Sequence, residues 1–162
     1  MDHRYYMHLA LIEANKALAR GEVPIGAVLV MDGQVVARAH NLVETDKDPT
    51  AHAEVLAIRQ AAQKTGSRRL PTSAMYVTVE PCPMCAGAIL QARVGILVYG
   101  AIDPKAGAVD SLMHLLNFPQ LNHQVHVVPG VLEEECRNLM QDFFAGLRKK
   151  RQSTGDGGGR NK

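Results

Sequence analysis

The strongest constraint on the fold of this chain comes from two short motifs, residues 50–54 (Thr-Ala-His-Ala-Glu) and residues 80–85 (Glu-Pro-Cys-Pro-Met-Cys). Each motif stands at the start of a segment with helical character, so each is predicted to lie at the N-terminus of a helix. Between Glu54 and Pro81 lie 26 residues, the length of a helix, a loop and a strand. A connection of this length can place the two helix ends side by side at one edge of a sheet.

The elements predicted around these motifs alternate between helices and short strands. Apolar periodicity and helix-forming composition predict helices over residues 2–20, 51–64, 84–92 and 132 to about 150. Apolar and β-branched runs predict strands over residues 25–31, 34–40, 75–79, 96–99 and 125–128, with a hairpin turn at Asp32-Gly33. Residues 41–50 and 103–122 are predicted to be loops, and the length of the second loop favours a functional role.

This order predicts an α/β protein with three layers, α/β/α, built on a five-stranded mixed sheet. We expect one domain over residues 1–150, followed by a basic, glycine-rich, disordered tail over residues 151–162. From Arg148 onward, six basic residues accompany one acidic residue, Asp156. A basic end of this kind is compatible with phosphate contacts, and a solubilising tail is the alternative interpretation.

The composition narrows the class of protein further. The chain has 162 residues, of which 46% are hydrophobic and 21% charged, and these proportions exclude wholesale disorder. The sequence contains neither 18 consecutive apolar residues nor the apolar core of a signal peptide, so we expect a soluble, cytoplasmic protein with no membrane partner. Three cysteines do not make a disulfide scaffold, and in a reducing compartment they indicate metal ligands or a redox pair.

Cys82, Cys85 and His52 have the chemistry of a zinc site. The two cysteines are three residues apart, so their sulfurs face the same way on the first helical turn. The helix dipole favours thiolates there, and His52 adds an imidazole. Three protein ligands leave one tetrahedral position open for water, as in catalytic zinc sites. A closed structural site would need a fourth ligand, which Cys136 could supply, although a packed core thiol is the better interpretation of Cys136.

Glu54 is the residue that could make such a site catalytic. At a helix tip, His52 and Glu54 can both lean past the helix end toward one point. A carboxylate there can take a proton from a metal-bound water and pass it to a leaving group. Alternatively, Glu54 is only a charge favoured by the helix dipole. The Cys-x-x-Cys pair alone also fits a dithiol redox centre, but that interpretation leaves His52 and Glu54 without a role.

Together the two motifs resemble the His-x-Glu…Pro-Cys-x-x-Cys signature of the zinc-dependent nucleoside and nucleobase deaminases. The resemblance implies a cytidine-deaminase-like fold and one zinc ion per subunit, held by His52, Cys82 and Cys85. It also implies hydrolytic deamination, in which a zinc-activated hydroxide attacks the amine-bearing carbon of a base. Glu54 would carry the protons, and ammonia would leave.

Within this superfamily the chain is most similar to the bacterial tRNA-specific adenosine deaminases. The similar stretches reach nearly to residue 147 and comprise Asn41 and residues 23–30, 48–54, 76–88, 100–108, 111–113, 122–123 and 135–144. This resemblance implies that the substrate is the wobble adenosine of a tRNA anticodon stem-loop, which is converted to inosine. It also implies a homodimer, with splayed anticodon nucleotides held in pockets.

The same resemblance assigns substrate-binding residues. Asn41 would hydrogen-bond the target base, and Asp103 with residues 105–112 would hold flanking nucleotides. His123 would line the rim of the pocket, and Phe144 on the C-terminal helix would offer a stacking surface for a base. Outside the family context, Asn41 and Asp103 can be explained as turn residues. Phe143 and Phe144 are adjacent on a helix, so at most one of them can face the core.

Two rival functions share these features. A deaminase of a free base or nucleoside would carry the same zinc signature. A catalytically silent zinc module that binds RNA would need the three ligands but would have no use for Glu54 or for an open metal position.

Overall fold

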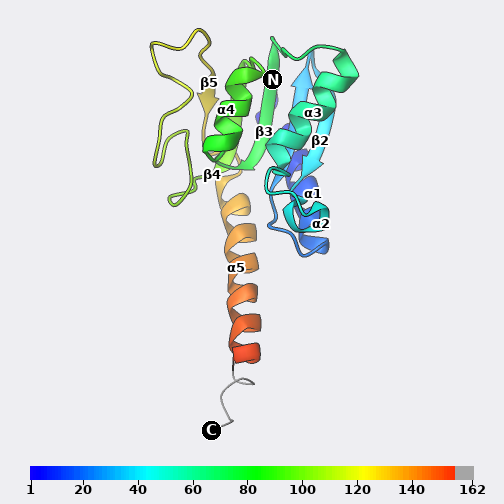
Figure 1. Ribbon diagram of the computed structural model, residues 1–162, viewed down its shortest axis with the longest axis vertical. Helices are drawn as coiled ribbons and strands as arrows, with labels where there is room; N and C mark the ends of the chain where they lie inside the picture. Colours follow the sequence, from blue (N-terminus) through cyan, green and yellow to red (C-terminus); the bar gives the residue numbers. More distant parts are fainter. Residues whose placement is uncertain (156–162) are drawn as a thin grey trace.

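The computed structural model describes residues 1–155, which form a five-stranded sheet with helices on both faces (Figure 1). The elements in chain order are α1 (His3–Ala19), β1 (Gly26–Met31), β2 (Gln34–His40), α2 (Val43–Asp46), α3 (Ala53–Thr65), β3 (Ser73–Val79), α4 (Pro83–Gln91), β4 (Ile96–Ala101), β5 (His126–Val128) and α5 (Glu133–Gly155). The strand order is β2-β1-β3-β4-β5. β1 is antiparallel to β2 and β3, whereas β3, β4 and β5 are parallel. The predicted mixed sheet is therefore confirmed.

Local sequence signals explain where several elements begin and end. The β1–β2 hairpin turns at Asp32 and Gly33, which have φ values of 51° and 73°. Two consecutive residues with positive φ are typical of the type I′ turn, whose twist matches the strands that it joins. The Asp2 side chain caps α1 by accepting a hydrogen bond from the amide of Tyr5, and Gly66 ends α3 in the left-handed conformation.

The sheet is covered by α1 and the start of α5 on one face and by α3 and α4 on the other, as the three-layer prediction requires. The core against α3 and α4 includes Leu29, Met75, Ile89 and Leu97. The core against α1 and α5 includes Met7, Val28, Tyr76 and Val98. Every residue of β3 is buried, because this strand is covered on both faces.

Two segments differ from the prediction. The loop over residues 41–50 contains the short helix α2, because Glu22 accepts hydrogen bonds from the amides of Glu44 and Thr45 at its N-terminus. α5 continues to Gly155, past the predicted helix end near Lys150. The rest of the predicted disordered tail, residues 156–162, lies outside the described residues. Within residues 1–155, no helix combines the length and apolarity needed to span a membrane.

The topology places two helix N-termini at one edge of the sheet. β3 leads into α4 through residues 80–82, and α3 follows β2 through residues 41–52. α3 and α4 lie side by side on the same face (Figure 1). The two motifs that were predicted to meet are therefore both at the C-terminal end of β3.

Candidate metal and catalytic site

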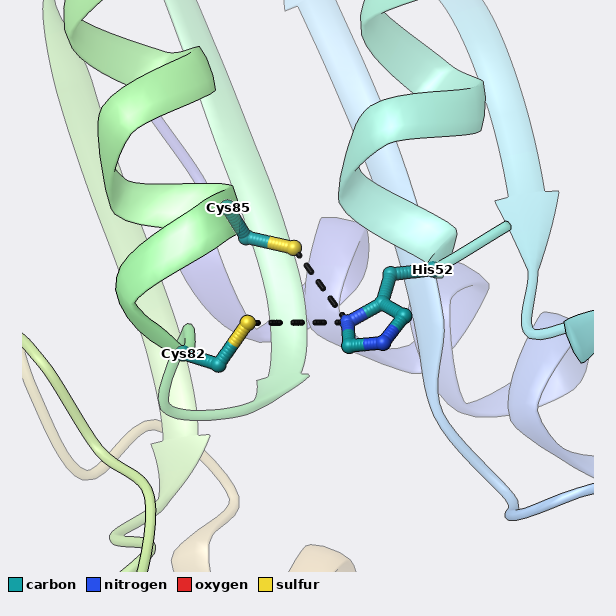
Figure 2. A group of neighbouring side chains, drawn as sticks. All are labelled: His52, Cys82 and Cys85. Carbon is teal, nitrogen blue, oxygen red and sulfur yellow. Dashed lines mark hydrogen bonds between the residues drawn. The ribbon is translucent and has the colours of Figure 1, made fainter. Parts of the chain in front are cut away.

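His52, Cys82 and Cys85 converge between the N-termini of α3 and α4 (Figure 2). His52 is the residue just before α3, and Cys82 is the residue just before α4. The Nδ1 atom of His52 is 3.6 Å from the sulfur of Cys82 and 3.5 Å from the sulfur of Cys85. All three candidate ligand atoms lie within 4.8 Å of one another. The predicted juxtaposition of the two motifs is confirmed.

The distances between these atoms fit a tetrahedral zinc ion. A nitrogen at about 2.0 Å and a sulfur at about 2.3 Å from a tetrahedral zinc lie about 3.5 Å apart. The two nitrogen–sulfur separations match this value. Neither His52 nor Cys82 uses its side chain to cap its own helix, so both side chains are directed to the common centre. Three ligands from the chain leave a fourth position for water or substrate.

The three donors differ in how readily they lose a proton. A hydrogen bond from the Cys85 thiol lowers the pKa of Cys82 to about 4, against the opposing effect of burial. The same hydrogen bond raises the pKa of Cys85, and burial adds to the rise. The hydrogen bond with Cys82 raises the pKa of His52, although burial acts in the other direction. The lowered pKa favours the thiolate of Cys82, the form that binds metal.

Glu54 lies in the first turn of α3, next to this ligand set, and is only 4% exposed. Burial raises its pKa, while its own backbone amide and the Cys85 thiol act in the opposite direction. Its Oε1 atom has no hydrogen-bond partner within residues 1–155. A buried carboxylate oxygen without a hydrogen bond costs free energy. We therefore expect Oε1 to accept a hydrogen bond from a group outside the described chain, such as a water molecule or an amine.

Asn41 is 6% exposed and lies beside the start of α3. Its Oδ1 atom accepts a hydrogen bond from the amide of Ala53 at 2.9 Å. Asn41 therefore caps the helix that carries Glu54, a task that the helix's own preceding residue, His52, does not perform. The structure thus places Asn41 beside the start of α3, and its contact with a base stays a prediction.

Asp103 opens the segment of residues 103–111, which follows β4 at the same edge of the sheet. Its Oδ1 atom accepts hydrogen bonds from the amides of Lys105 and Ala106, both at 3.1 Å, as a turn-initiating aspartate does. The segment is tied to the site because the amide of Ala108 donates to the carbonyl of Pro81, next to Cys82. The turn role of Asp103 is visible, and its contact with a nucleotide stays a prediction.

Three other residues lie apart from the ligand set. The Nε2 atom of His123 is 2.7 Å from the carbonyl oxygen of Val94, which precedes the first residue of β4. His123 therefore lies at the N-terminal end of β4, the end of the sheet away from the metal ligands. Phe144 is 41% exposed on α5, which extends away from the sheet (Figure 1), and its ring contacts Phe143 edge-on. Cys136 packs against Gly100 on the α1 and α5 side of the sheet and is not part of the metal site.

Glu80 has a structural role that the sequence motifs did not predict, although it stands within the second motif. Glu80 is 3% exposed, and its carboxylate accepts hydrogen bonds from five donors in residues 103–111. The available signal was an acidic residue directly after an apolar strand and directly before Pro81. A charge at such a buried position needs hydrogen-bond donors, which the following loop supplies.

Comparisons with known proteins agree with this geometry. The model of the MafB19-like deaminase family matches residues 1–148. The tRNA-specific adenosine deaminase of Bacillus subtilis is 53% identical over 148 residues, which cover 91% of this chain and 92% of the relative. That of Agrobacterium fabrum is 47% identical over 150 residues, 93% of this chain and 97% of the relative. A solved structure from studies of A-to-I editing by tRNA:A34 deaminases has a TM-score of 0.81 and 49% identity, and covers 83% of this chain and 98% of its own.

Proposed function

Because this chain belongs to the tRNA-specific adenosine deaminases of the MafB19-like deaminase family, we propose that it converts the wobble adenosine of a tRNA anticodon loop to inosine, with release of ammonia. The observation that carries this proposal is the unpartnered Oε1 atom of Glu54, buried next to a three-ligand metal site. A purely structural zinc site has four protein ligands and needs no such carboxylate.

The donor set supports zinc, with one ion per subunit held by His52, Cys82 and Cys85. Two sulfurs and one imidazole are ligands that zinc prefers. A bound zinc ion supplies Lewis acidity, which makes water a nucleophile at neutral pH. Cys82 and Cys85 contribute negative charge to the site, and His52 contributes through Nδ1.

Glu54 supplies the proton transfers. Its carboxylate accepts a proton from the attacking water and passes it to the ring nitrogen next to the amine-bearing carbon. It then takes the remaining hydroxyl proton and delivers it to the departing amino group, so that ammonia leaves and a carbonyl oxygen replaces the amine on the purine. Burial favours the protonated form of Glu54 and raises its pKa, which suits a group that must hold a proton and then donate it.

Substrate recognition is assigned to residues at the same edge of the sheet. The amide nitrogen of Asn41 donates to the target base, since its oxygen is held by Ala53. Asp103 and residues 105–112 contact flanking nucleotides, and Phe144 offers an exposed aromatic face. For His123 to take part, the RNA would have to reach the opposite edge, where His123 lines a cleft with Arg69 and Arg93.

The proposal includes a homodimer that acts in the cytoplasm. Exposed apolar side chains gather in the segment after β4, where Leu112 is 60% exposed, Met113 45% and Phe118 47%. Such side chains are typical of surfaces that another chain covers. All three cysteines are free thiols, which suits a reducing compartment.

The test is inosine formation on an anticodon stem-loop with adenosine at the wobble position. Free adenosine, cytidine and guanine, and the same stem-loop with guanosine at that position, are the controls. We expect turnover on the adenosine-containing RNA alone. Turnover only on a small base would overturn the tRNA assignment but keep the metal chemistry, and silence on every substrate with zinc bound would favour an RNA-binding module.

A further inference from the structure

The Glu80 carboxylate sits inside a cradle of hydrogen-bond donors from residues 103–111. Its Oε2 atom accepts hydrogen bonds from the consecutive amides of Val109, Asp110 and Ser111, at 3.1, 2.8 and 3.0 Å. Its Oε1 atom accepts from the amide of Asp103 at 3.0 Å and from the hydroxyl of Ser111. Successive amides that converge in this way form a backbone anion site, here filled by a side chain of the same protein.

Gly107 shows how closely the segment wraps around this carboxylate. A Cβ atom built on Gly107 would overlap the carboxyl carbon and both carboxyl oxygens of Glu80, and these are its three nearest heavy atoms. The backbone of Gly107 is not in the left-handed region, so the carboxylate alone excludes a larger residue. The segment is therefore shaped around Glu80.

Glu80 joins this segment to the metal site. It lies two residues before Cys82, at the end of the buried strand β3, and its amide donates to the carbonyl of Ala101. The intervening Pro81 accepts a hydrogen bond from Ala108 at 2.9 Å. Residues 107–109 are buried, whereas residues 104–106 and 112–114 are exposed on the outer side of the segment.

We propose that Glu80 is a positioning residue that holds residues 103–111 in the shape required to bind RNA beside the target adenosine. The proposal rests on the proposed function, because it assigns the outer side of this segment to the RNA. Glu80 itself touches no substrate. Without its carboxylate the three amides lose their common acceptor, the segment opens, and RNA binding weakens while the metal ligands and Glu54 stay in place.

The first experiment compares wild type with Glu80→Ala and Glu80→Gln. We expect amide hydrogen exchange at residues 109–111 to accelerate at least about tenfold in Glu80→Ala, and less in Glu80→Gln, which keeps one acceptor oxygen. The KM for the stem-loop should rise about tenfold or more, while kcat stays within about threefold and zinc content is unchanged.

Glu22→Ala is the matched control, because Glu22 is another buried carboxylate that accepts hydrogen bonds from backbone amides. This substitution should accelerate exchange at the amides of residues 44 and 45 but not at those of residues 109–111.

Acetate provides a rescue test, because Glu80→Ala removes the atoms of one acetate ion. Acetate should restore exchange protection at residues 109–111 in Glu80→Ala, and acetamide at the same concentration should not. Protection that stays at the wild-type level in Glu80→Ala would overturn the proposal. So would a fall in kcat with an unchanged KM, because the residue would then act on chemistry. If wild type turns over no RNA, the exchange measurements still test the cradle, so the two proposals fail separately.

Gly107 provides a second test that does not depend on the stability of Glu80→Ala. Gly107→Ala should accelerate exchange and raise the KM in the wild-type background, because the new methyl group displaces the carboxylate. In the Glu80→Ala background the same substitution should change either measurement by less than about twofold, since the obstructing group is gone. Equal effects in both backgrounds would overturn the proposal.

Discussion

The side-chain oxygen of Asn41 accepts a hydrogen bond from the amide of Ala53 across 2.9 Å, and this bond defines how position 41 can act on a substrate. The family resemblance implies that Asn41 hydrogen-bonds the target base, and an asparagine can use both of its polar atoms on an adenine. The structure commits the oxygen to the first residue of α3. The amide nitrogen is not used in this bond, so we expect Asn41 to act on a base mainly as a hydrogen-bond donor.

Asn41→Asp and Asn41→Ala should separate these two roles. Asn41→Asp keeps an oxygen for Ala53 but turns the substrate-facing donor into an acceptor, so kcat/KM should fall at least about tenfold with little change in stability. Asn41→Ala removes the cap as well and should lower the free energy of unfolding by about 1 kcal/mol. Urea unfolding and steady-state kinetics on the stem-loop measure both effects. Equal loss of stability in both variants would contradict the capping role.

Glu54→Gln should keep the shape of the site and remove the group that transfers protons. We expect kcat to fall by about a hundredfold to ten-thousandfold, with zinc content unchanged. Glu54→Ala should retain zinc in the same way. A Glu54→Ala protein that deaminates within about tenfold of wild type would refute the assignment of the proton transfers.

Cys85→Ala should lose zinc, because two ligands remain where the geometry offers three. Metal binding contributes to the free energy of folding, so the melting temperature should fall as well. Cys136→Ala is the matched control, since Cys136 is an equally buried thiol on the other face of the sheet. It should keep one zinc ion per chain and lose about 1 kcal/mol of stability from the vacated space. Stoichiometric zinc in Cys85→Ala would exclude the proposed ligand set.

Acid should destabilise the protein partly through Glu22. Burial alone would raise the pKa of this carboxylate, but hydrogen bonds from Thr45 and Glu44 lower it below its ordinary value of 4.5. A lowered folded-state pKa contributes stability that is present above the unfolded value and is lost as pH falls through the folded one. The free energy of unfolding should therefore decrease below about pH 4.5 in wild type, and less steeply in Glu22→Gln. Urea titrations between about pH 3 and 6 test this, and parallel curves for the two proteins would contradict it.

Much of the fold and the metal site could be predicted because their signals are local. Asp32-Gly33 specifies a hairpin through two backbone angles, and the spacing of Cys82 and Cys85 follows from one helical turn. The 26 residues between Glu54 and Pro81 then allow the N-termini of the two helices to lie side by side. The helix α2 could not be predicted in this way, because it depends on Glu22, which lies about twenty residues earlier in the chain.

The hydrogen bonds that Glu80 and His123 make could not be predicted, for the same physical reason. The donors to Glu80 lie 23 to 31 residues further along the chain, and no local pattern shows that they return to it. His123 follows a long loop, and its position depends on where that loop meets the start of β4. Hydrogen bonds between residues far apart in the sequence thus determine the loop positions that hydrophobic periodicity and local motifs cannot predict.

The wrapping of residues 103–111 around Glu80 also limits how this enzyme can be re-engineered. A loop transplanted from another deaminase brings backbone amides shaped for the acceptor of its own scaffold. In a chimera, the end of β3 with Glu80 and the segment after β4 therefore form one exchangeable unit, although 22 residues lie between Glu80 and Asp103 in the sequence. Libraries that vary RNA preference should diversify the exposed positions 104–106 and 112–114 and keep Glu80 and Gly107 fixed.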